Sequence, residues 1–194
     1  MKVLIVYAHP NPQSFSHAIL EEFTKGLEEG GHAFEVVDLY GIGFDPRLTP
    51  QDLAQFQGGE MPQDVRAQQQ KVAGAEGLAF ISPLYWGNVA AMLDGWFQRV
   101  FSLGFAFAPP QKGGVGPTGL LTNTRAVLMC PTMAKEPLYE ATGVDDALEK
   151  RLVNYVLKGC GVKQAECVLL HGAALDPEAR KRHLELVHKL GKEF

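Results

Sequence analysis

The N-terminal stretch constrains the fold most, because an unbroken apolar run there stops abruptly at a proline-containing loop. Residues 3–6 include no polar residue, which is typical of a central parallel strand that is buried on both faces of a sheet. His9 and Pro10 end the run, and the loop that follows contains a second proline. Ser14 or Ser16 can cap the helix that the next residues predict. The stretch therefore predicts a strand, a short loop and the beginning of a helix.

A junction of this kind can bind an anion. The free N–H groups of the first helical turn and the positive end of the helix dipole both point at whatever lies there. A plain capped turn, which every α/β protein contains, has the same local pattern. The interpretation of this junction as a phosphate-binding loop therefore depends on what the rest of the chain places beside it.

Five apolar runs alternate with helical patterns along the chain. Strands are predicted at residues 3–6, 34–39, 77–82, 125–130 and 162–170. Helices are predicted at residues 16–29, 63–73, 92–101, 144–157 and 177–190, with a short helix from Thr49 that is broken at residues 57–62. Alternating strands and helices form right-handed βαβ units, so we expect a doubly wound α/β fold whose five-stranded parallel sheet has helices on both faces. The 194 residues suit a single domain, residues 1–194.

Charge and composition argue against several classes of function. The formal net charge of −4 argues against nucleic acid as the main partner. No apolar stretch reaches the length of a membrane span, and the N-terminus lacks the pattern of a secretory signal. Cys130, Cys160 and Cys167 lack the spacing of metal ligands, so we expect no metal site and mostly buried, reduced thiols. The chain is therefore predicted to be cytoplasmic, with no integral membrane segment.

Three segments follow the first, third and fourth predicted strands, at residues 9–16, 83–88 and 131–134. In doubly wound sheets, ligands bind at the carboxyl ends of the strands, beside the point where the strand order reverses. We therefore expect the three segments to converge on one crevice. A G-x-G-x-x-G pattern at residues 114–119 is rejected as a dinucleotide site, because it neither follows a strand nor opens a helix.

The second of these segments contains large apolar side chains where a strand-end loop is usually polar. Leu84, Tyr85 and Trp86 follow Pro83 directly. The three side chains can be tucked into the core, or they can form a flat apolar wall, with backbone N–H groups, for a planar heteroaromatic ring. The residues by themselves favour neither interpretation.

The chain resembles the NAD(P)H:quinone oxidoreductase (DT-diaphorase) family in three blocks. They are His9-x-x-x-x-Ser14-Phe15-Ser16-x-Ala18, Pro83-Leu84-Tyr85-Trp86 and Gly95-Trp96-Phe97-Gln98-Arg99-Val100-Phe101. Residues 105–107 and 132–139 continue the match, which runs in register over essentially the whole chain. The resemblance implies a flavodoxin-like fold with strand order 2-1-3-4-5 and a flavin bound at a homodimer interface. It also implies two-electron reduction of quinones by NADH or NADPH.

The flavin contacts of the family carry over onto three groups of residues in this chain. The cofactor-binding set that the resemblance implies is His9, Ser14, Phe15, Ser16, Ala18, Pro83, Leu84, Tyr85, Trp86, Gly87, Pro131, Thr132 and Met133. The first group would contact the flavin phosphate, the second would lie along the isoalloxazine, and the third would meet its pyrimidine end. Relatives have a Thr-Thr-Gly-Gly turn in the third group, of which only Thr132 is retained, and Pro131 has no N–H to donate.

Tyr139 matches the catalytic tyrosine of the family, but Asp145 stands where relatives have its histidine partner. In relatives the pair stabilises negative charge at the N1/O2 edge of the flavin as hydride arrives at N5. An ionised carboxylate cannot do this, because like charges repel. Either the Tyr139 hydroxyl acts alone, or Asp145 simply caps the next helix, and the local sequence favours the cap.

The expected function is that of a flavoprotein NAD(P)H dehydrogenase that reduces a quinone or a similar planar acceptor. FAD is favoured over FMN, because residues 51–70 and 176–180 resemble parts that meet the adenosine half of FAD in relatives. Two other functions remain open, an ancillary flavin-binding regulatory subunit of a potassium-efflux transporter and a flavodoxin-type electron carrier. A homodimer is expected from the resemblance and from the aromatic residues at 96–107, which exceed what one helix stripe can bury.

Overall fold

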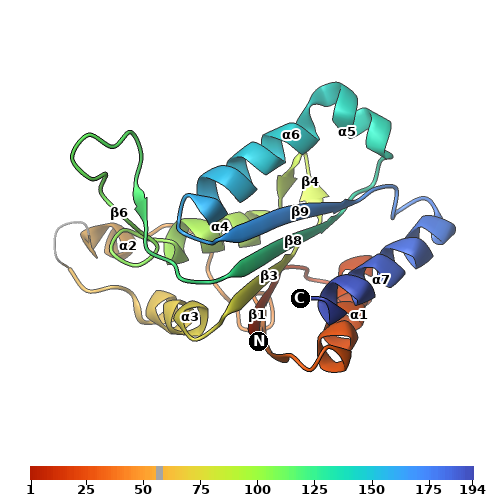
Figure 1. The fold of residues 1–194 in the computed structure, drawn as a ribbon, viewed down its shortest axis with the longest axis horizontal. Coiled ribbons are helices and arrows are strands. Elements are labelled where there is room, and N and C mark those ends of the chain that lie inside the picture. The colour runs from red at the N-terminus through yellow and green to blue at the C-terminus, as the bar shows by residue number, and fades with distance from the viewer. Residues whose placement is uncertain (56–58) are drawn as a thin grey trace.

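The computed structural model describes residues 1–55 and 59–194. Its central sheet has five parallel strands, β1 (Lys2–Tyr7), β2 (Ala33–Asp38), β3 (Gly77–Ile81), β8 (Arg125–Pro131) and β9 (Gln164–Leu170). Their order in the sheet is β2-β1-β3-β8-β9 (Figure 1). In chain order these strands are the second, first, third, fourth and fifth, so the predicted flavodoxin-like order is confirmed. The order reverses at β1 and β3, where Val3 pairs with Gly77.

Helices cover both faces of the sheet (Figure 1). α1 (Phe15–Glu29) and α7 (Pro177–Lys192) pack together on one face, over a core of inward-facing side chains from β1, β3 and β8. The other face carries α3 (Gln63–Ala73), α4 (Ala91–Val100) and α6 (Val144–Leu148), which continues as a π-helix over Glu149–Lys158. Gly26 permits the close contact of α1 with α7, since a Cβ there would lie 2.1 Å from the His188 carbonyl oxygen. The α3 bounds agree with the predicted ones.

Local capping signals in the sequence set where several helices begin. Ser14 caps α1 by accepting a hydrogen bond from the His17 N–H at 3.2 Å. Thr49 and Asp52 form a capping box at the start of α2 (Pro50–Ala54), as the Thr-Pro signal predicts. Asp176 caps α7 through the N–H groups of its first turn. The helix break predicted at residues 57–62 lies partly outside the described residues, because residues 57 and 58 are not described.

Three short features were absent from the sequence-based prediction. The loop after β3 forms a hairpin of β4 (Leu84–Tyr85) and β5 (Asn88–Val89), and the 104–123 region contains the pair β6 (Phe107–Ala108) and β7 (Thr118–Gly119). α5 (Glu136–Thr142) occupies part of the segment read as a loop. The G-x-G-x-x-G letters lead into β7 and not into a helix, so rejecting them as a dinucleotide site was correct.

Three of the five aromatic residues in the 96–107 segment are buried within the chain and need no partner for that, whereas Phe105 and Phe107 are only partly buried. Trp96, Phe97 and Phe101 pack edge-to-face or tilted against one another, and the first two also contact Phe80 of β3. The sheet and the neighbouring helices therefore supply the burial that one helix stripe could not. The expectation of a homodimer therefore rests mainly on the resemblance and stays a prediction.

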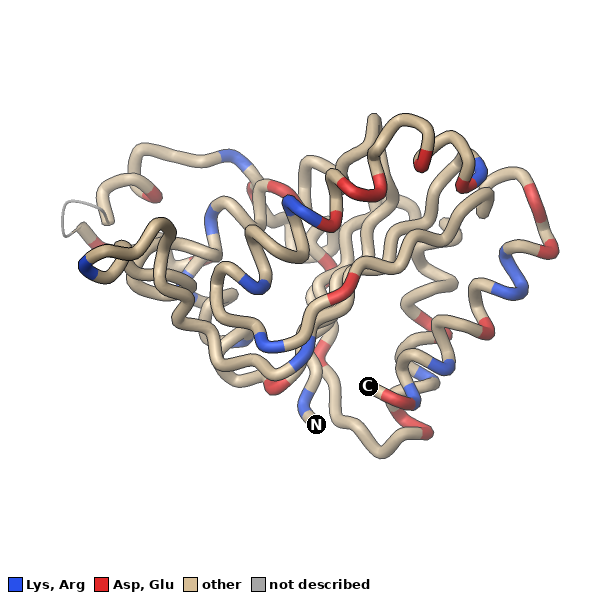
Figure 2. Tube along the Cα trace, turned by 45° about the horizontal axis from the view of Figure 1, so that its top comes forward, with Lys and Arg blue, Asp and Glu red and all other residues tan. Residues whose placement is uncertain are grey.

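The surface and the thiols agree with the sequence-based expectations. Figure 2 shows Lys and Arg interspersed with Asp and Glu along the helices, and no helix or strand of the described chain is positive throughout. Cys130 and Cys160 are buried, Cys167 is partly exposed, and all three are free thiols. Burial raises the pKa of Cys160 to about 11, so this thiol stays protonated and unreactive. Among the described helices, none is long and apolar enough to cross a membrane.

Candidate functional site

A pocket of about 190 Å³ lies where the chain leaves the carboxyl ends of β1, β3 and β8. Ten of the thirteen predicted cofactor-binding residues line it, namely His9, Ser14, Phe15, Ser16, Pro83, Leu84, Tyr85, Pro131, Thr132 and Met133. Ala173, Ala174 and Arg180 complete the lining. The three segments therefore converge, as the topology of the sheet predicts. Ala18, Trp86 and Gly87 lie outside the lining, and the role of the whole set in binding a cofactor stays a prediction.

The β1–α1 junction presents donors to this pocket. The N–H groups of Phe15 and Ser16 make none of the hydrogen bonds found among the described residues, and the first turn of α1 contains no acidic side chain. Burial raises the pKa of Tyr7 and outweighs the opposite effect of its hydrogen bond with Ser14 at 3.5 Å, so the phenol stays neutral. The Arg180 guanidinium lies 5.6 Å from the centre of the Phe15 ring. Free N–H groups, a helix dipole and a nearby cation together favour an anion here.

The β4–β5 hairpin forms a second wall and has a strained tip. Its two-residue turn is Trp86-Gly87, with φ of 52° and 76°. Among the described residues, Trp86 is the only non-glycine residue with positive φ. This conformation is energetically unfavourable for any residue that has a Cβ atom. The side chain of Trp86 is fully exposed, at 105%, and that of Tyr85 is 55% exposed. The interpretation that these side chains are tucked into the core is therefore wrong for Tyr85 and Trp86, whereas Leu84 packs partly against the core.

The third wall is a turn after β8 that is tied to the end of β9. The Thr132 N–H donates to the Leu170 carbonyl at 3.1 Å, and the Gly172 N–H donates to the Ala134 carbonyl at 2.9 Å. The Thr132 hydroxyl donates to the same Ala134 carbonyl, also at 2.9 Å. The one retained residue of the family turn is therefore buried and holds the turn in shape. Met133, which also lines the pocket, is exposed.

Asp145 does not cap a helix, so that interpretation is wrong. α6 begins after Gly143, which has φ 69° and offers no side-chain cap, and Asp145 lies within the first turn. Its Oδ2 lies 3.8 Å from Nε2 of His171. The ring of Tyr139 packs against the same histidine, with 5.1 Å between ring centroids and 39° between planes. Tyr139 itself lies outside the lining of the pocket.

His171 was not foreseen from the sequence. The residue directly follows β9, whose carboxyl end borders the pocket, and this position was the one signal that could have found it. Its neighbours Tyr139 and Asp145 come from α5 and α6. Ala173 and Ala174, which line the pocket, follow it within three residues. The end of the fifth strand therefore belongs to the candidate site as much as the ends of the other three.

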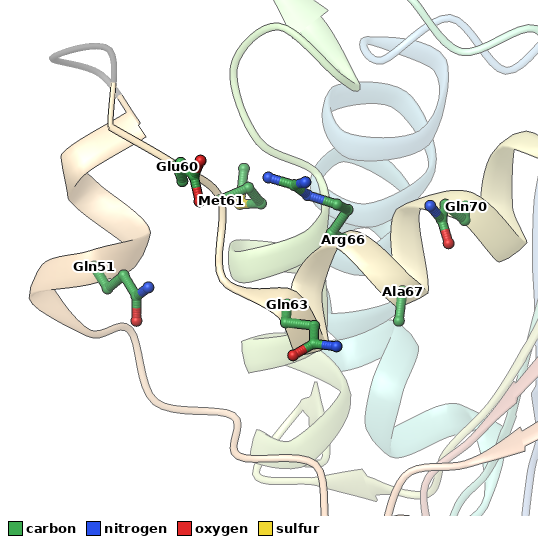
Figure 3. Close-up of a pocket in the computed structure, with 7 residues that line it drawn as sticks. All are labelled: Gln51, Glu60, Met61, Gln63, Arg66, Ala67 and Gln70. Carbon is green, nitrogen blue, oxygen red and sulfur yellow. The ribbon is translucent and has the colours of Figure 1, made fainter.

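A larger hollow of about 500 Å³ lies between α2 and α3 (Figure 3). It is lined by Gln51, Glu60, Met61, Gln63, Arg66, Ala67 and Gln70. No aromatic side chain and no residue of the predicted cofactor-binding set is among them. The described lining of this hollow therefore offers no flat apolar wall of the kind that a planar ring needs. It falls in the 51–70 segment, part of which lies outside the described residues.

Residues 1–192 match the model of the Flavodoxin_2 family, whose description is a flavodoxin-like fold. The chain belongs to this family. An uncharacterized NAD(P)H oxidoreductase of Haemophilus influenzae is similar to this chain. The two are 31% identical over 188 residues, which cover 96% of this chain and 92% of the relative.

Solved structures agree with the family assignment. An NAD(P)H:quinone oxidoreductase from Methanothermobacter marburgensis is 33% identical to this Flavodoxin_2 chain and superposes with a TM-score of 0.90, covering 100% of this chain and 96% of the other. The predicted resemblance to NAD(P)H:quinone oxidoreductases is thereby confirmed. An FMN-dependent NADH-azoreductase from Bacillus anthracis, solved in complex with FMN, is 20% identical to this chain and superposes with a TM-score of 0.76. The match covers 99% of this chain and 98% of the azoreductase. This last likeness bears on the fold alone.

Proposed function

We propose that this chain is a flavin-dependent NAD(P)H:quinone oxidoreductase whose flavin lies in the pocket at the ends of β1, β3 and β8. The observation that carries the proposal is the pocket itself, where three separate loops bring together an anion-binding helix start and an apolar wall. The names of its relatives in the Flavodoxin_2 family, an NAD(P)H oxidoreductase and an NAD(P)H:quinone oxidoreductase, support the reaction class.

The residues of the pocket fit the two halves of a flavin. The N–H groups of Phe15 and Ser16 would hold the phosphate at the start of α1, where no acidic side chain opposes it. Leu84 and Tyr85 would lie along the ring, and Thr132 would border its pyrimidine end. A bound flavin supplies the redox chemistry, taking hydride from NADH or NADPH and giving it to a quinone. The chain supplies binding, orientation and shielding from water.

We propose FAD as the cofactor, with FMN as the alternative. Ala173, Ala174 and Arg180 line the pocket beside the start of α1, where the phosphate would lie, and next to the start of α7. FMN ends at its phosphate, whereas FAD continues into a second phosphate and an adenosine. The Arg180 guanidinium is held near Phe15 by hydrogen bonds to the carbonyl groups of Ala173 and Ala174. A fixed cation at this point favours the ligand that carries the additional phosphate.

We also propose that the active form is a homodimer. Pockets that enclose ligands of cofactor size measure roughly 300–1,000 Å³, and the pocket of this chain measures about 190 Å³. Trp86 lies at the tip of the hairpin whose Tyr85 lines the pocket, with its side chain fully exposed. A second copy that covers this residue would enlarge the enclosed site and remove the exposed indole from water.

No specific observation favours either the transporter subunit or the one-electron carrier over the oxidoreductase. The relatives of known name are oxidoreductases, which agrees with turnover by the chain itself. The cytoplasmic location stays a prediction.

The proposal is tested by the visible absorption spectrum of the purified protein after reconstitution with FAD or FMN. A bound flavin band should bleach on anaerobic addition of NADH or NADPH and return when a quinone is added. Multiple turnovers by the isolated protein would make a transporter partner unnecessary. Absence of a flavin band after reconstitution with either cofactor would refute the proposed function.

A further inference from the structure

Two large apolar side chains that line the pocket are exposed at its mouth. Tyr85 of the β4–β5 hairpin is 55% exposed, and Met133 of the turn after β8 is 68% exposed. The other large apolar residues of the lining, Phe15 and Leu84, are partly buried. A ligand that covers Tyr85 and Met133 would remove their apolar surface from water, which is favourable. The two residues together form an apolar rim of the pocket.

The backbone on both sides of Met133 is fixed by hydrogen bonds. The Thr132 N–H donates to the Leu170 carbonyl at 3.1 Å. The Ala134 carbonyl accepts at 2.9 Å from both the Gly172 N–H and the Thr132 hydroxyl. The methionine side chain itself is unbranched and adaptable, and a thioether makes favourable contacts with aromatic rings. Met133 is therefore an adaptable apolar group on a fixed base.

Tyr85 also stands on supported backbone. It pairs with Asn88 in the β4–β5 hairpin, and the side-chain carbonyl of Asn88 accepts a hydrogen bond from the Arg151 guanidinium at 2.5 Å. The turn of the hairpin packs against α6, since a Cβ on Gly87 would lie 3.3 Å from the Val144 side chain. The π-helix and α6 thus support the hairpin, so a ligand that contacts the rim has little backbone to order.

The pocket is too small for two stacked planar molecules. Its volume is about 190 Å³, whereas cavities that enclose a drug-sized ligand measure roughly 300–1,000 Å³. A flavin ring in the pocket would therefore leave the quinone at the mouth, against the apolar rim. A quinone with a second, fused ring presents more apolar surface there than a single-ring quinone does.

We propose that the apolar rim makes this chain favour fused-ring over single-ring quinones, with Met133 as the main specificity-determining residue. The fused ring covers the Met133 thioether and the exposed part of Tyr85, and this contact removes apolar surface from water on both sides. A single ring covers less of the rim and gains less from it. The proposal rests on the proposed function and names the substrate class of that same site.

Two uncharged quinones that differ by the fused ring test the proposal. Dimethyl-1,4-naphthoquinone has a fused benzene ring where tetramethyl-1,4-benzoquinone has two methyl groups, and the fully substituted quinone ring of each does not add thiols. Their dissociation constants from the oxidised flavoprotein are measured without NADH or NADPH, by the change in flavin absorbance. The wild type should bind the naphthoquinone more tightly, and Met133→Ala should reduce this preference about fivefold. An unchanged preference in Met133→Ala, or a wild type that favours the single ring, would overturn the proposal.

A conservative variant and a matched control separate a contact with the quinone from a general effect of the substitution. Met133→Leu keeps an apolar side chain of similar size and should restore most of the preference. Leu175 is 71% exposed, close to the value for Met133, and lies outside the lining of the pocket. Leu175→Ala should therefore keep the wild-type preference, and an equal loss in this control would overturn the role of Met133. The ratio of kcat/KM for the two quinones should follow the binding preference in all four proteins.

The proposal and the proposed function fail in different ways. A wild type that binds flavin and turns over, with the same quinone preference in Met133→Ala, would remove the role of Met133 and leave the proposed function standing. A Met133→Ala protein that binds no flavin would show that Met133 contacts the cofactor instead, which also overturns the proposal. A wild-type protein that binds no flavin would overturn the proposed function and, with it, the role of the rim toward a quinone.

Discussion

Arg99→Met should destabilise the protein strongly, because Arg99 is the centre of a buried ionic cluster that attaches α2 and α3 to α4. Its Nε donates to Asp52 at 2.9 Å, and one terminal nitrogen donates both to Asp64 at 2.6 Å and to the Asp45 carbonyl at 2.7 Å. The Arg99 side chain is 4% exposed and that of Asp52 is 1% exposed. Methionine keeps most of the aliphatic stem and removes the charge.

The expected magnitude follows from what the substitution leaves behind. Asp52 would remain buried as an unpaired carboxylate, and breaking a buried pair on one side costs about 3–5 kcal/mol of unfolding free energy. Asp64→Asn should cost less than about 1 kcal/mol, because the Asp64 side chain is 48% exposed. The double variant Arg99→Met/Asp52→Asn should be more stable than Arg99→Met alone, since no uncompensated charge is left in the interior.

Urea unfolding followed by circular dichroism measures all four proteins under one set of conditions. The free energies of unfolding should rank the wild type first, then Asp64→Asn, then the double variant, then Arg99→Met. A loss below about 1 kcal/mol in Arg99→Met, or a double variant less stable than Arg99→Met, would refute the reasoning. Either result would mean that water or a rearranged side chain compensates Asp52.

Three further predictions concern single residues. Burial would raise the pKa of Asp52, but hydrogen bonds from Thr49 and Arg99 hold this pKa below its ordinary value. The ionised Asp52 therefore stabilises the fold fully above its ordinary pKa, and this stabilisation is lost as the pH falls through the lower pKa of the folded protein. Asp52→Asn should therefore flatten the acid side of a profile of melting temperature against pH. Ser14→Ala removes the cap of α1 and should lower the unfolding free energy by about 1 kcal/mol and weaken flavin binding; unchanged values would contradict the cap. Trp86→Asn relieves the positive φ at the hairpin tip and should raise the melting temperature of the monomer by about 2–4 °C, so a fall would contradict the strain.

The main sheet and the pocket were predictable because their signals are local and periodic. The apolar run at residues 3–6 is long enough to mark a strand that is buried on both faces, and β1 is buried over Val3 to Tyr7. Sheet topology alone then brings the ends of β1, β3 and β8 together. α3 was predicted with its observed bounds because Val65 and Val72 recur with helical spacing. Chain connectivity thus placed most of the predicted residues around one pocket.

The features that were missed carry weak local signals or depend on distant contacts. α5 has no buried residue, so it lacks the apolar periodicity that marks a helix. The β4–β5 hairpin has strands of two residues, and its turn is Trp-Gly where Asn-Gly is the usual signal. The contact of His171 with Thr132 joins residues that lie far apart in the sequence. Only the folded arrangement of β8 and β9 reveals that contact.

The most direct test of the central claim is a flavin titration of two matched alanine-to-tryptophan variants. Ala174 is exposed and lines the proposed flavin pocket, and Ala67 is exposed and lines the hollow between α2 and α3 (Figure 3). A tryptophan at either position fills space without disturbing the core. Quenching of flavin fluorescence should show that Ala174→Trp weakens FMN and FAD binding by about tenfold or more, whereas Ala67→Trp binds FMN like the wild type. Normal binding by Ala174→Trp, with FMN binding lost in Ala67→Trp, would contradict the account and move the site to the other hollow.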